Sequence, residues 1–263
     1  AFGLRGAPRG PNTAPERAPK EPALRSAEEP PEARPCPTSS PFLSSGPVAV
    51  ALFGEIDRRL REAFGDPERP RFDPLELLVR TILSQNTSDR NRDRAYEALR
   101  ARFPKLEEVA AAPVEEVAAA LRPAGMHHQR ARRLQEVLRR ILAERGELSL
   151  SFLEALPPKE AEAWLLSLPG VGKKTAYIVL LFAFGHERFP VDTHIARVTQ
   201  RLGLWNGRGD PHEALAPLIP RGRAYPLHLN LIRLGREYCR PRNPRCSRCP
   251  LRTLCAYAQK EEG

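Results

Sequence analysis

The chain has 263 residues, enough for one large domain or two smaller ones with buried cores. It carries 42 Lys and Arg residues against 32 Asp and Glu, and this net charge of +10 favours a polyanionic partner, most often nucleic acid. The longest apolar run, residues 176–184, is about half the length of a membrane-spanning helix, so no membrane partner is expected. The first residues lack the apolar core of a secretion signal, and we therefore expect a cytoplasmic protein.

Residues 1–44 differ from the rest in composition. They hold ten of the 28 prolines, six basic and five acidic residues, and few large apolar side chains. Such a segment cannot bury enough surface to offset its conformational entropy, so we predict an N-terminal extension that is disordered. Its net charge is only +1, which leaves +9 of the total +10 on the remainder. The basic charge therefore belongs to the folded part.

From Val48 onward the apolar residues recur at helical spacing almost throughout. Asp73 and Ser88 are suited to cap helices, with Pro74 at a first helical position, and Pro113 separates two short helices. No alternating strand pattern is present, so the sequence predicts an all-α fold. The expected helices span residues 48–64, 74–84, 91–103, 106–121 with its break, 129–145, 159–168, 173–184, 193–202 and 227–238.

A glycine-rich turn at residues 168–176 joins two of these helices, with the sequence Leu-Pro-Gly-Val-Gly-Lys-Lys-Thr-Ala. Glycines there allow positive φ and leave no Cβ in the way, so the amides that begin the next helix can point at a phosphate oxygen. An ordinary helix–helix turn is the alternative for Gly-x-Gly taken alone. We interpret the full string as a helix–hairpin–helix that holds the DNA backbone without reading sequence. The expected DNA contacts here are Gly170, Val171, Gly172, Lys173 and Thr175.

Lys174 lies in the first turn of the helix that follows the hairpin. The helix dipole and the neighbouring Lys173 both disfavour its charged form, which favours a neutral amine that can attack a carbon. Asp192 follows eighteen residues later in the string Val-Asp-Thr-His and could simply be a helix cap. A carboxylate is nevertheless what a positive sugar intermediate needs for stabilisation. Lys174 and Asp192 are therefore the predicted catalytic pair.

Four of the five cysteines lie within seventeen residues near the end of the chain, with the spacing C-x6-C-x2-C-x5-C. Four thiolates in one short loop can enclose a compact metal centre. Zinc is the alternative, but zinc sites usually pair cysteines as two CxxC units, and only one is present. The predicted ligands are Cys239, Cys246, Cys249 and Cys255; Cys36 stands apart. The same loop carries arginines that we expect to contact phosphates, namely Arg240, Arg242 and Arg245.

The hairpin string followed by Val-Asp-Thr-His resembles the endonuclease III family of helix–hairpin–helix DNA glycosylases. The resemblance implies that Lys174 forms a Schiff base, that Asp192 is the essential carboxylate and that His194 lies near the DNA backbone. The cysteine spacing matches the family's cluster motif and implies a [4Fe–4S] cluster. The matching motifs span about residues 74–255, and the cluster is expected to have a structural and DNA-positioning role.

The resemblance also implies an architecture of two helical domains with the DNA cleft between them. Residues 67–187 are expected to form a six-helix barrel that contains the helix–hairpin–helix. Residues 45–66 and 188–263 are expected to form a discontinuous iron–sulfur cluster domain. This discontinuity comes from the family and not from the residue pattern.

A glycosylase must turn its target nucleotide out of the helix and fill the gap. Gln85 and Asn86 follow a buried helix, and Asn86 falls at the family's gap-filling glutamine in an ungapped comparison. Gln85 lies one residue away, so either amide could fill the gap. Met126 falls at the family's wedge leucine, and a core residue at a helix start is the alternative for it. These differences leave the preferred damage and the preferred opposite base open.

The sequence therefore predicts a monomeric bifunctional DNA glycosylase and AP lyase of base excision repair, acting on oxidised pyrimidines in damaged double-stranded DNA and associated with a bacterial-type nucleoid. A mismatch-specific glycosylase is one alternative. Its adenine branch has a glutamate where this chain has Thr81, lacks the lyase lysine and carries a further C-terminal domain, whereas a thymine-specific enzyme would differ only in pocket residues. A non-catalytic DNA-binding module is the alternative from another class.

Overall fold

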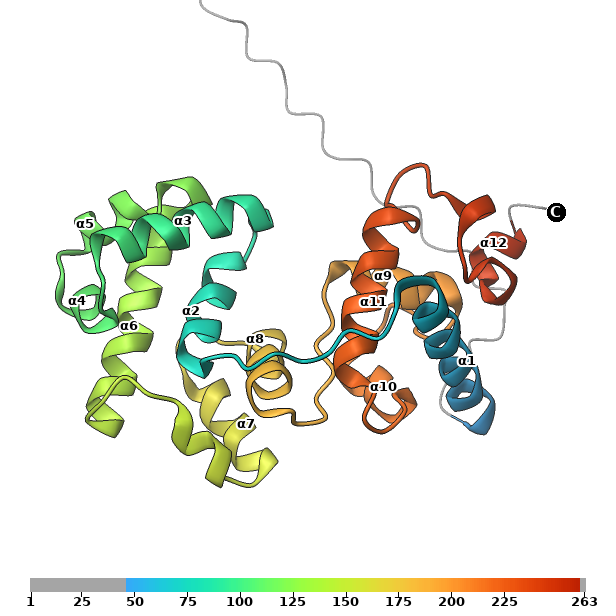
Figure 1. The fold of residues 1–263 in the computed structure, drawn as a ribbon, viewed down its shortest axis with the longest axis horizontal. Coiled ribbons are helices and arrows are strands. Elements are labelled where there is room, and N and C mark those ends of the chain that lie inside the picture. Colours follow the sequence, from blue (N-terminus) through green and yellow to red (C-terminus); the bar gives the residue numbers. More distant parts are fainter. Residues whose placement is uncertain (1–45, 261–263) are drawn as a thin grey trace, which may run out of the picture. The chain divides into compact units, whose positions relative to one another are not determined.

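A computed structural model describes residues 46–260, which form helices joined by loops (Figure 1). The predicted disorder of residues 1–44, and Cys36 with it, lies outside this range. No strand occurs within residues 46–260, which confirms the predicted all-α fold for this part of the chain. None of its helices is both long and apolar enough to cross a bilayer. The main helices are α1 (Pro47–Phe64), α2 (Pro74–Ser84), α3 (Asp89–Arg102), α4 (Leu106–Ala111), α5 (Val114–Ala120), α6 (His127–Arg145), α7 (Pro158–Ser167), α8 (Lys173–Val179), α9 (Thr193–Leu202) and α11 (Ala224–Glu237).

Several helices begin where the sequence places a capping side chain. Asp73 Oδ1 accepts a hydrogen bond of 2.8 Å from the amide of Glu76, and Pro74 occupies the first helical position of α2. Ser88 Oγ accepts one of 3.3 Å from the amide of Asn91, and α3 begins at Asp89, two residues before the predicted start. Each cap satisfies an amide that the first helical turn leaves without a partner.

The helix predicted over residues 173–184 changes character halfway. After α8, residues Leu180–Phe184 form a π-helical turn, η3, which ends at Gly185. The guanidinium of Arg69 donates to the carbonyls of Phe182 and Ala183, each at 3.0 Å. Because Arg69 is far away in sequence, no local pattern indicates this turn.

The sequence did not predict the short elements of the fold. These are η1 (Arg122–Ala124), η2 (Ser151–Ala155), α10 (Pro211–Leu215), η4 (Ala216–Leu218), η5 (Cys246–Arg248), η6 (Arg252–Leu254) and α12 (Ala256–Lys260).

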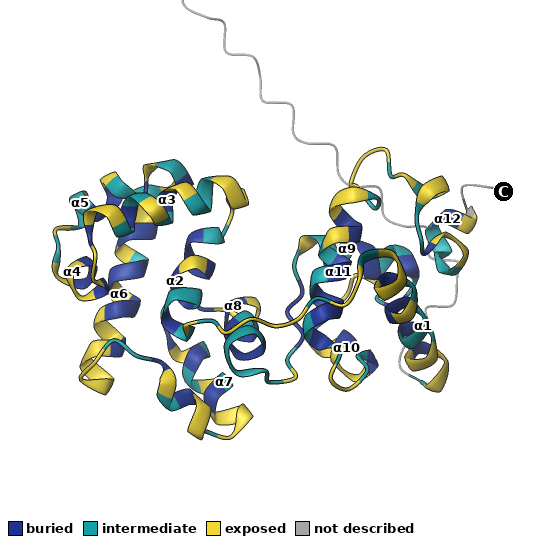
Figure 2. Cartoon of the chain, in the orientation of Figure 1, coloured by how far each residue is buried: buried dark blue, intermediate teal, exposed yellow. Residues whose placement is uncertain are grey.

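A first hydrophobic core is built by helices α2 to α8, a continuous stretch of sequence. Its fully buried side chains are almost all aliphatic, such as Leu78, Leu134 and Leu138. Helix α6 contributes one buried face, and exposed positions alternate with it along the helix (Figure 2). The core ends at Leu180.

A second core joins the start of the described chain to its last third. Helix α1 contributes Phe53, Ile56 and Leu60, which belong to the same cluster as residues of α9 and α11. Arg223 at the start of α11 strengthens this connection, because its guanidinium forms a 2.7 Å ion pair with Asp57 of α1. Leu181 belongs to this second core, although Leu180 belongs to the first. The chain therefore passes from one core to the other inside η3.

Candidate active site and cysteine loop

The hairpin between α7 and α8 differs in one respect from the prediction. Gly170 has a φ of 71°, in the left-handed region that favours glycine. Gly172 instead has a φ of −93° and an extended conformation, as the residue that precedes α8. Positive φ is therefore not the reason for the second glycine. A Cβ at Gly172 would meet no atom within 4 Å, so the glycine leaves open space in front of the helix start.

Not every predicted contact of the hairpin offers a free group. The side chain of Val171 is buried in the first core, and its amide donates to the carbonyl of Leu168 at 3.2 Å. The side chain of Thr175 is also buried. Both side chains therefore support the hairpin from inside, and the predicted contact of this segment with DNA would be made by its main chain. The amides of the first turn of α8 have no partner inside the helix, as in any α-helix.

Lys173 forms ion pairs with Asp210 and Glu213 near α10. These carboxylates stabilise its charged form and raise the pKa of Lys173. Lys173 was predicted to disfavour the charged form of Lys174. Because two carboxylates offset the charge of Lys173, its repulsion of Lys174 is weaker than predicted.

Lys174 and Asp192 line one cavity of about 900 Å³. Lys174 is exposed, and its amine has no hydrogen bond or ion pair within residues 46–260. Asp192 Oδ1 accepts a 2.8 Å hydrogen bond from the amide of Ile195, so Asp192 is a helix cap and also faces the cavity. The cavity is large enough for a nucleotide. Its wall includes side chains from α2 and α3, which help to build the first core, and from α9 and α11, which help to build the second.

Two histidines also line this cavity. His194, a predicted contact, lies with its Nδ1 3.1 Å from the guanidinium of Arg197, and burial lowers the pKa of His194. His228 was not predicted: it is 2% exposed, and its Nδ1 lies 2.9 Å from the carbonyl of Pro190. The pKa of His228 is lowered to about 4, mainly by burial and in part by the charge of Lys174, whereas Asp192 opposes this shift. No motif surrounds His228 among the leucines of α11, so its position at the cavity could not be predicted from the sequence.

The two amides after α2 have different environments. Gln85 is held at both ends of its side chain: its Oε1 accepts from Arg133 at 2.7 Å, and its Nε2 donates to the carbonyl of Gly170 at 3.3 Å. Asn86 is exposed, has a φ of 54° and makes no side-chain hydrogen bond within the described chain. Met126 is 51% exposed with a φ of 45°, so it is no core residue.

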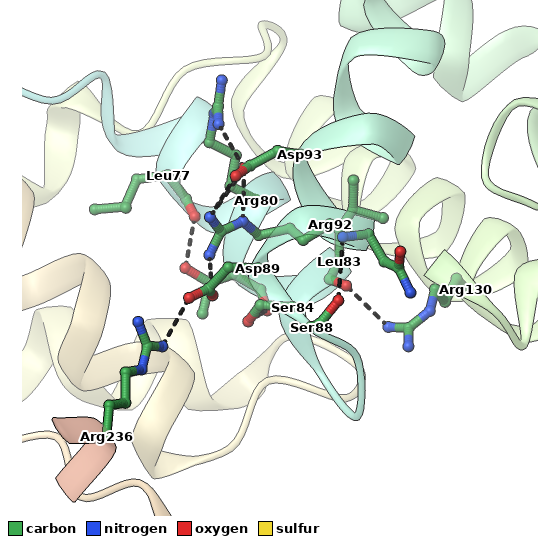
Figure 3. Close-up of polar contacts among 12 residues, drawn as sticks. Leu77, Arg80, Leu83, Ser84, Ser88, Asp89, Arg92, Asp93, Arg130 and Arg236 are labelled. Carbon is green, nitrogen blue, oxygen red and sulfur yellow. Dashed lines mark hydrogen bonds and ion pairs between the residues drawn. The ribbon is translucent and has the colours of Figure 1, made fainter. Parts of the chain in front are cut away.

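Polar contacts connect α3 with α11 at the rim of the cavity (Figure 3). Asp89 accepts from Arg92 at 2.9 Å and from Arg236 at 2.7 Å. Asp93 contacts both Arg80 and Arg92. All five side chains are partly or fully exposed, so these pairs contribute little to stability. They place the guanidinium groups of three arginines beside the cavity that Lys174 and Asp192 line.

The four cysteines of the C-terminal loop line a single small cavity. None of them forms a disulfide. Arg201 contacts two of the sulfurs, Cys239 through its guanidinium and Cys255 through its carbonyl, both at 3.4 Å. Burial raises the pKa of the Cys249 thiol to about 11. No group of three or more His, Cys, Asp or Glu side chains within residues 46–260 is arranged to hold a metal ion.

The arginines of this loop give it a positive charge. Arg240, Arg242 and Arg245 are exposed and form no ion pair with a carboxylate in the part of the chain that the structure describes. The loop therefore presents uncompensated positive charge, as predicted from its sequence.

Comparisons with known proteins identify the family of this chain. Residues 79–218 match the family model described as HhH-GPD superfamily base excision DNA repair protein. The chain is 34% identical to endonuclease III of Thermotoga maritima, with 72% of this chain and 85% of that protein covered. It is 30% identical to the thymine/uracil-DNA glycosylase of Methanothermobacter thermautotrophicus, with 80% and 92% covered. The fold is similar to an endonuclease III solved as a trapped covalent intermediate with DNA, with a TM-score of 0.70 and 27% identity over 81% of this chain and 99% of that one.

Proposed function

Because the chain belongs to the HhH-GPD superfamily of base excision DNA repair proteins and is a DNA glycosylase, we propose that it removes oxidised pyrimidines from duplex DNA and then cuts the abasic strand. The observation that carries the proposal is the shared cavity of Lys174 and Asp192. The positive charge of the folded part and the hairpin support DNA as the partner. A monomer associated with the nucleoid stays our prediction.

The reaction follows from an amine beside a deoxyribose. The lone pair of Lys174 Nζ attacks C1′, and the C1′–N bond to the base breaks. The base leaves with the electrons of this broken bond and takes up a proton. Loss of a proton from nitrogen and opening of the sugar ring give a Schiff base. Removal of a C2′ proton then breaks the C3′–O bond, and the phosphate on the 3′ side leaves. The carboxylate of Asp192 would stabilise the positive charge that develops at the sugar.

The hairpin would hold the DNA backbone by its main chain. Gly172 leaves room for a phosphate to approach the start of α8, and Lys174 follows two residues later. His194 lines the same cavity and is our proposed further contact. Lys173 would have to exchange its carboxylate partners for phosphate. In the loop after α2, the anchored side chain of Gln85 leaves the exposed Asn86 as the amide that we propose fills the gap.

We propose that the four cysteines hold a [4Fe–4S] cluster. The four thiols line one cavity, and their spacing contains a single CxxC pair where zinc sites usually have two, which favours a polynuclear centre. When bound, such a cluster would supply a rigid link between the cysteines and not a reactive group. The exposed Arg240, Arg242 and Arg245 would then face phosphates from a fixed loop.

We also propose that the domains follow the two cores. Residues 67–187 would form the barrel, and residues 45–66 and 188–263 the cluster domain. The separate hydrophobic clusters support this division, with the difference that Leu181, inside the barrel range, already belongs to the second core. DNA would then bind where the two meet, at the cavity.

The lyase step is tested by incubating the protein with a duplex that contains an abasic site, in the presence of borohydride. We expect a covalent protein–DNA adduct, because borohydride reduces a Schiff base to a stable amine. The adduct should vanish in Lys174→Ala and persist in the control Lys159→Ala, which replaces an exposed lysine of α7 that does not line the cavity. An unmutated protein that forms no adduct, or an adduct that survives Lys174→Ala, would contradict the proposal.

A thymine-mismatch glycosylase is the second candidate, because the thymine/uracil-DNA glycosylase relative covers 80% of this chain. Duplexes with thymine glycol or with a G·T mismatch distinguish the two. Faster base release from thymine glycol supports the main proposal, and faster release from the mismatch supports the second.

A further inference from the structure

Arg130 in the first turn of α6 is a buried guanidinium that no carboxylate within residues 46–260 neutralises. It is only 5% exposed. Its donors reach five backbone carbonyls: Gly125 at 2.8 Å, Leu83 at 3.2 Å, Ala124 at 3.3 Å, Ile82 at 3.4 Å and Gln85. Figure 3 shows the contact with Leu83. One side chain therefore binds two separate segments.

These carbonyls lie at the ends of two helical elements. Ile82, Leu83 and Gln85 end α2, and Ala124 and Gly125 end η1. Carbonyls at a helix end lack partners inside the helix and carry the negative end of its dipole. A planar guanidinium with five donors can satisfy several of them together, which compensates for the cost of burying its charge.

Both segments lead directly into exposed residues with strained backbone. Asn86 follows the last carbonyl of the first segment, with a φ of 54°, and Met126 follows the last carbonyl of the second, with a φ of 45°. Positive φ is unfavourable for residues with a Cβ and persists only where the surroundings hold it. Arg130 supplies such a restraint immediately before each residue.

The next turn of α6 extends the connection to the hairpin. Arg133 donates to Gln85 Oε1 at 2.7 Å, and Gln85 Nε2 donates to the carbonyl of Gly170. A Cβ at Gly170 would lie 2.5 Å from Nε of Arg133, so this arginine packs closely on the hairpin backbone. Arg130 and Arg133 thus link both exposed residues to the segment proposed to hold the DNA backbone.

We propose that Arg130 is a positioning residue for nucleotide extrusion: it fixes the two loops in one frame, so that Asn86 and Met126 enter the duplex together. This inference rests on the proposed function. Arg130 itself touches no DNA in this proposal, and it acts through the carbonyls that it binds. Its loss should therefore matter most where extrusion leaves a gap beside an opposite base that Asn86 and Met126 must fill.

The test compares Arg130→Lys with unmutated protein on two duplexes. One contains an abasic site opposite a guanine, and the other lacks the opposite nucleotide, so that no gap remains to be filled. We expect Arg130→Lys to slow adduct formation at least tenfold on the first duplex and less than threefold on the second. Lysine keeps the charge, but its single ammonium cannot reach both segments as the planar fork does.

Gln135→Met is the matched control. Gln135 is buried on the same helix, and its amide donates to the carbonyls of Val109 and Ala112, away from both loops. Its replacement also removes buried hydrogen bonds, but it should slow both duplexes equally. Thermal unfolding of both variants checks that any loss of stability is comparable. Equal slowing of the two duplexes by Arg130→Lys, or no slowing, would overturn the proposal.

A second measurement separates this proposal from the chemistry. A duplex with a tetrahydrofuran abasic analogue opposite 2-aminopurine reports by fluorescence whether the opposite base is unstacked, with no bond broken. The unmutated protein should raise the fluorescence, and Arg130→Lys should lose most of this rise. If the unmutated protein raises fluorescence but forms no borohydride adduct, the lyase proposal fails and the positioning role stands. If fluorescence is unchanged by Arg130→Lys, the positioning role fails.

Discussion

The two cores of this protein reach similar packing by different means. The first is built from a continuous segment whose helices bury aliphatic side chains. The second combines α1 with α9 and α11, and its neighbourhood includes an ion pair, buried histidines and four thiols. Local sequence can specify the first core almost alone. The second depends on groups that must find partners far away in sequence, and its stability should therefore respond to chemical conditions.

Loss of a cysteine should give the largest difference between the cores. In Cys249→Ser we expect the broad absorbance near 400 nm of the iron–sulfur chromophore to disappear, because the cluster loses a ligand. Amide hydrogen exchange should then become fast in α9 and α12 while α2 and α6 stay protected. Cys36→Ser is the control and should leave absorbance and exchange unchanged. Absorbance that persists in Cys249→Ser would contradict the proposed ligand set.

Acid should weaken the second core before the first. His228 has a pKa of about 4 in the folded protein and about 6.5 when unfolded. Between these values the unfolded state binds the extra proton, so stability rises with pH in this window and falls as pH drops from 6.5 to 4. The loss should be on the order of 3 kcal/mol. Urea unfolding at several pH values measures it.

His228→Asn is the variant for this test, because an amide can still donate to the carbonyl of Pro190 but does not titrate. Its stability should vary less between pH 4 and 6.5 than that of the unmutated protein. His128→Asn, at an exposed position on α6, is the control and should keep the full pH dependence. Identical pH dependence in all three proteins would assign the acid sensitivity to other groups.

The smallest change in stability is expected from Asp192→Asn. Asparagine caps a helix about as well as aspartate, so the free energy of unfolding should change by less than about 0.5 kcal/mol. Base release should nevertheless slow by roughly a hundredfold or more, because the amide cannot stabilise a positive sugar. Single-turnover kinetics and urea unfolding of the same sample measure both. A variant that is destabilised but fully active would show that Asp192 only caps the helix and has no catalytic role.

Local patterns predicted much of the fold. The starts at Pro74 and Thr193 follow from Asp73 and Asp192, whose caps act within three residues. The π-helical turn at Leu180–Phe184 could not be predicted, because Arg69 binds its carbonyls from far away in sequence. The short helix α10 was missed for lack of a periodic pattern over five residues.

The same distinction holds for the candidate site. Lys174 and Asp192 were predicted from motif and spacing, and the structure brings them to one cavity. The burial of Arg130 could not be predicted, because nothing local shows that carbonyls of two other segments surround it. The place of His228 at the site and the partners of Lys173 could not be predicted for the same reason. They depend on tertiary contacts between residues that share no motif.

The ion pairs of Lys173 have a consequence for how salt would act on DNA binding. A phosphate that reaches Lys173 displaces Asp210 and Glu213, and these freed carboxylates then attract cations from solution. Such a contact takes up ions as well as releasing them, so it contributes less than the usual increment of about 0.9 to the slope of log affinity against log salt concentration. Exposed Arg240, Arg242 and Arg245 have no carboxylates to displace. The contribution of the hairpin to DNA affinity would thus depend weakly on salt concentration. The cysteine loop would contribute most of the salt dependence.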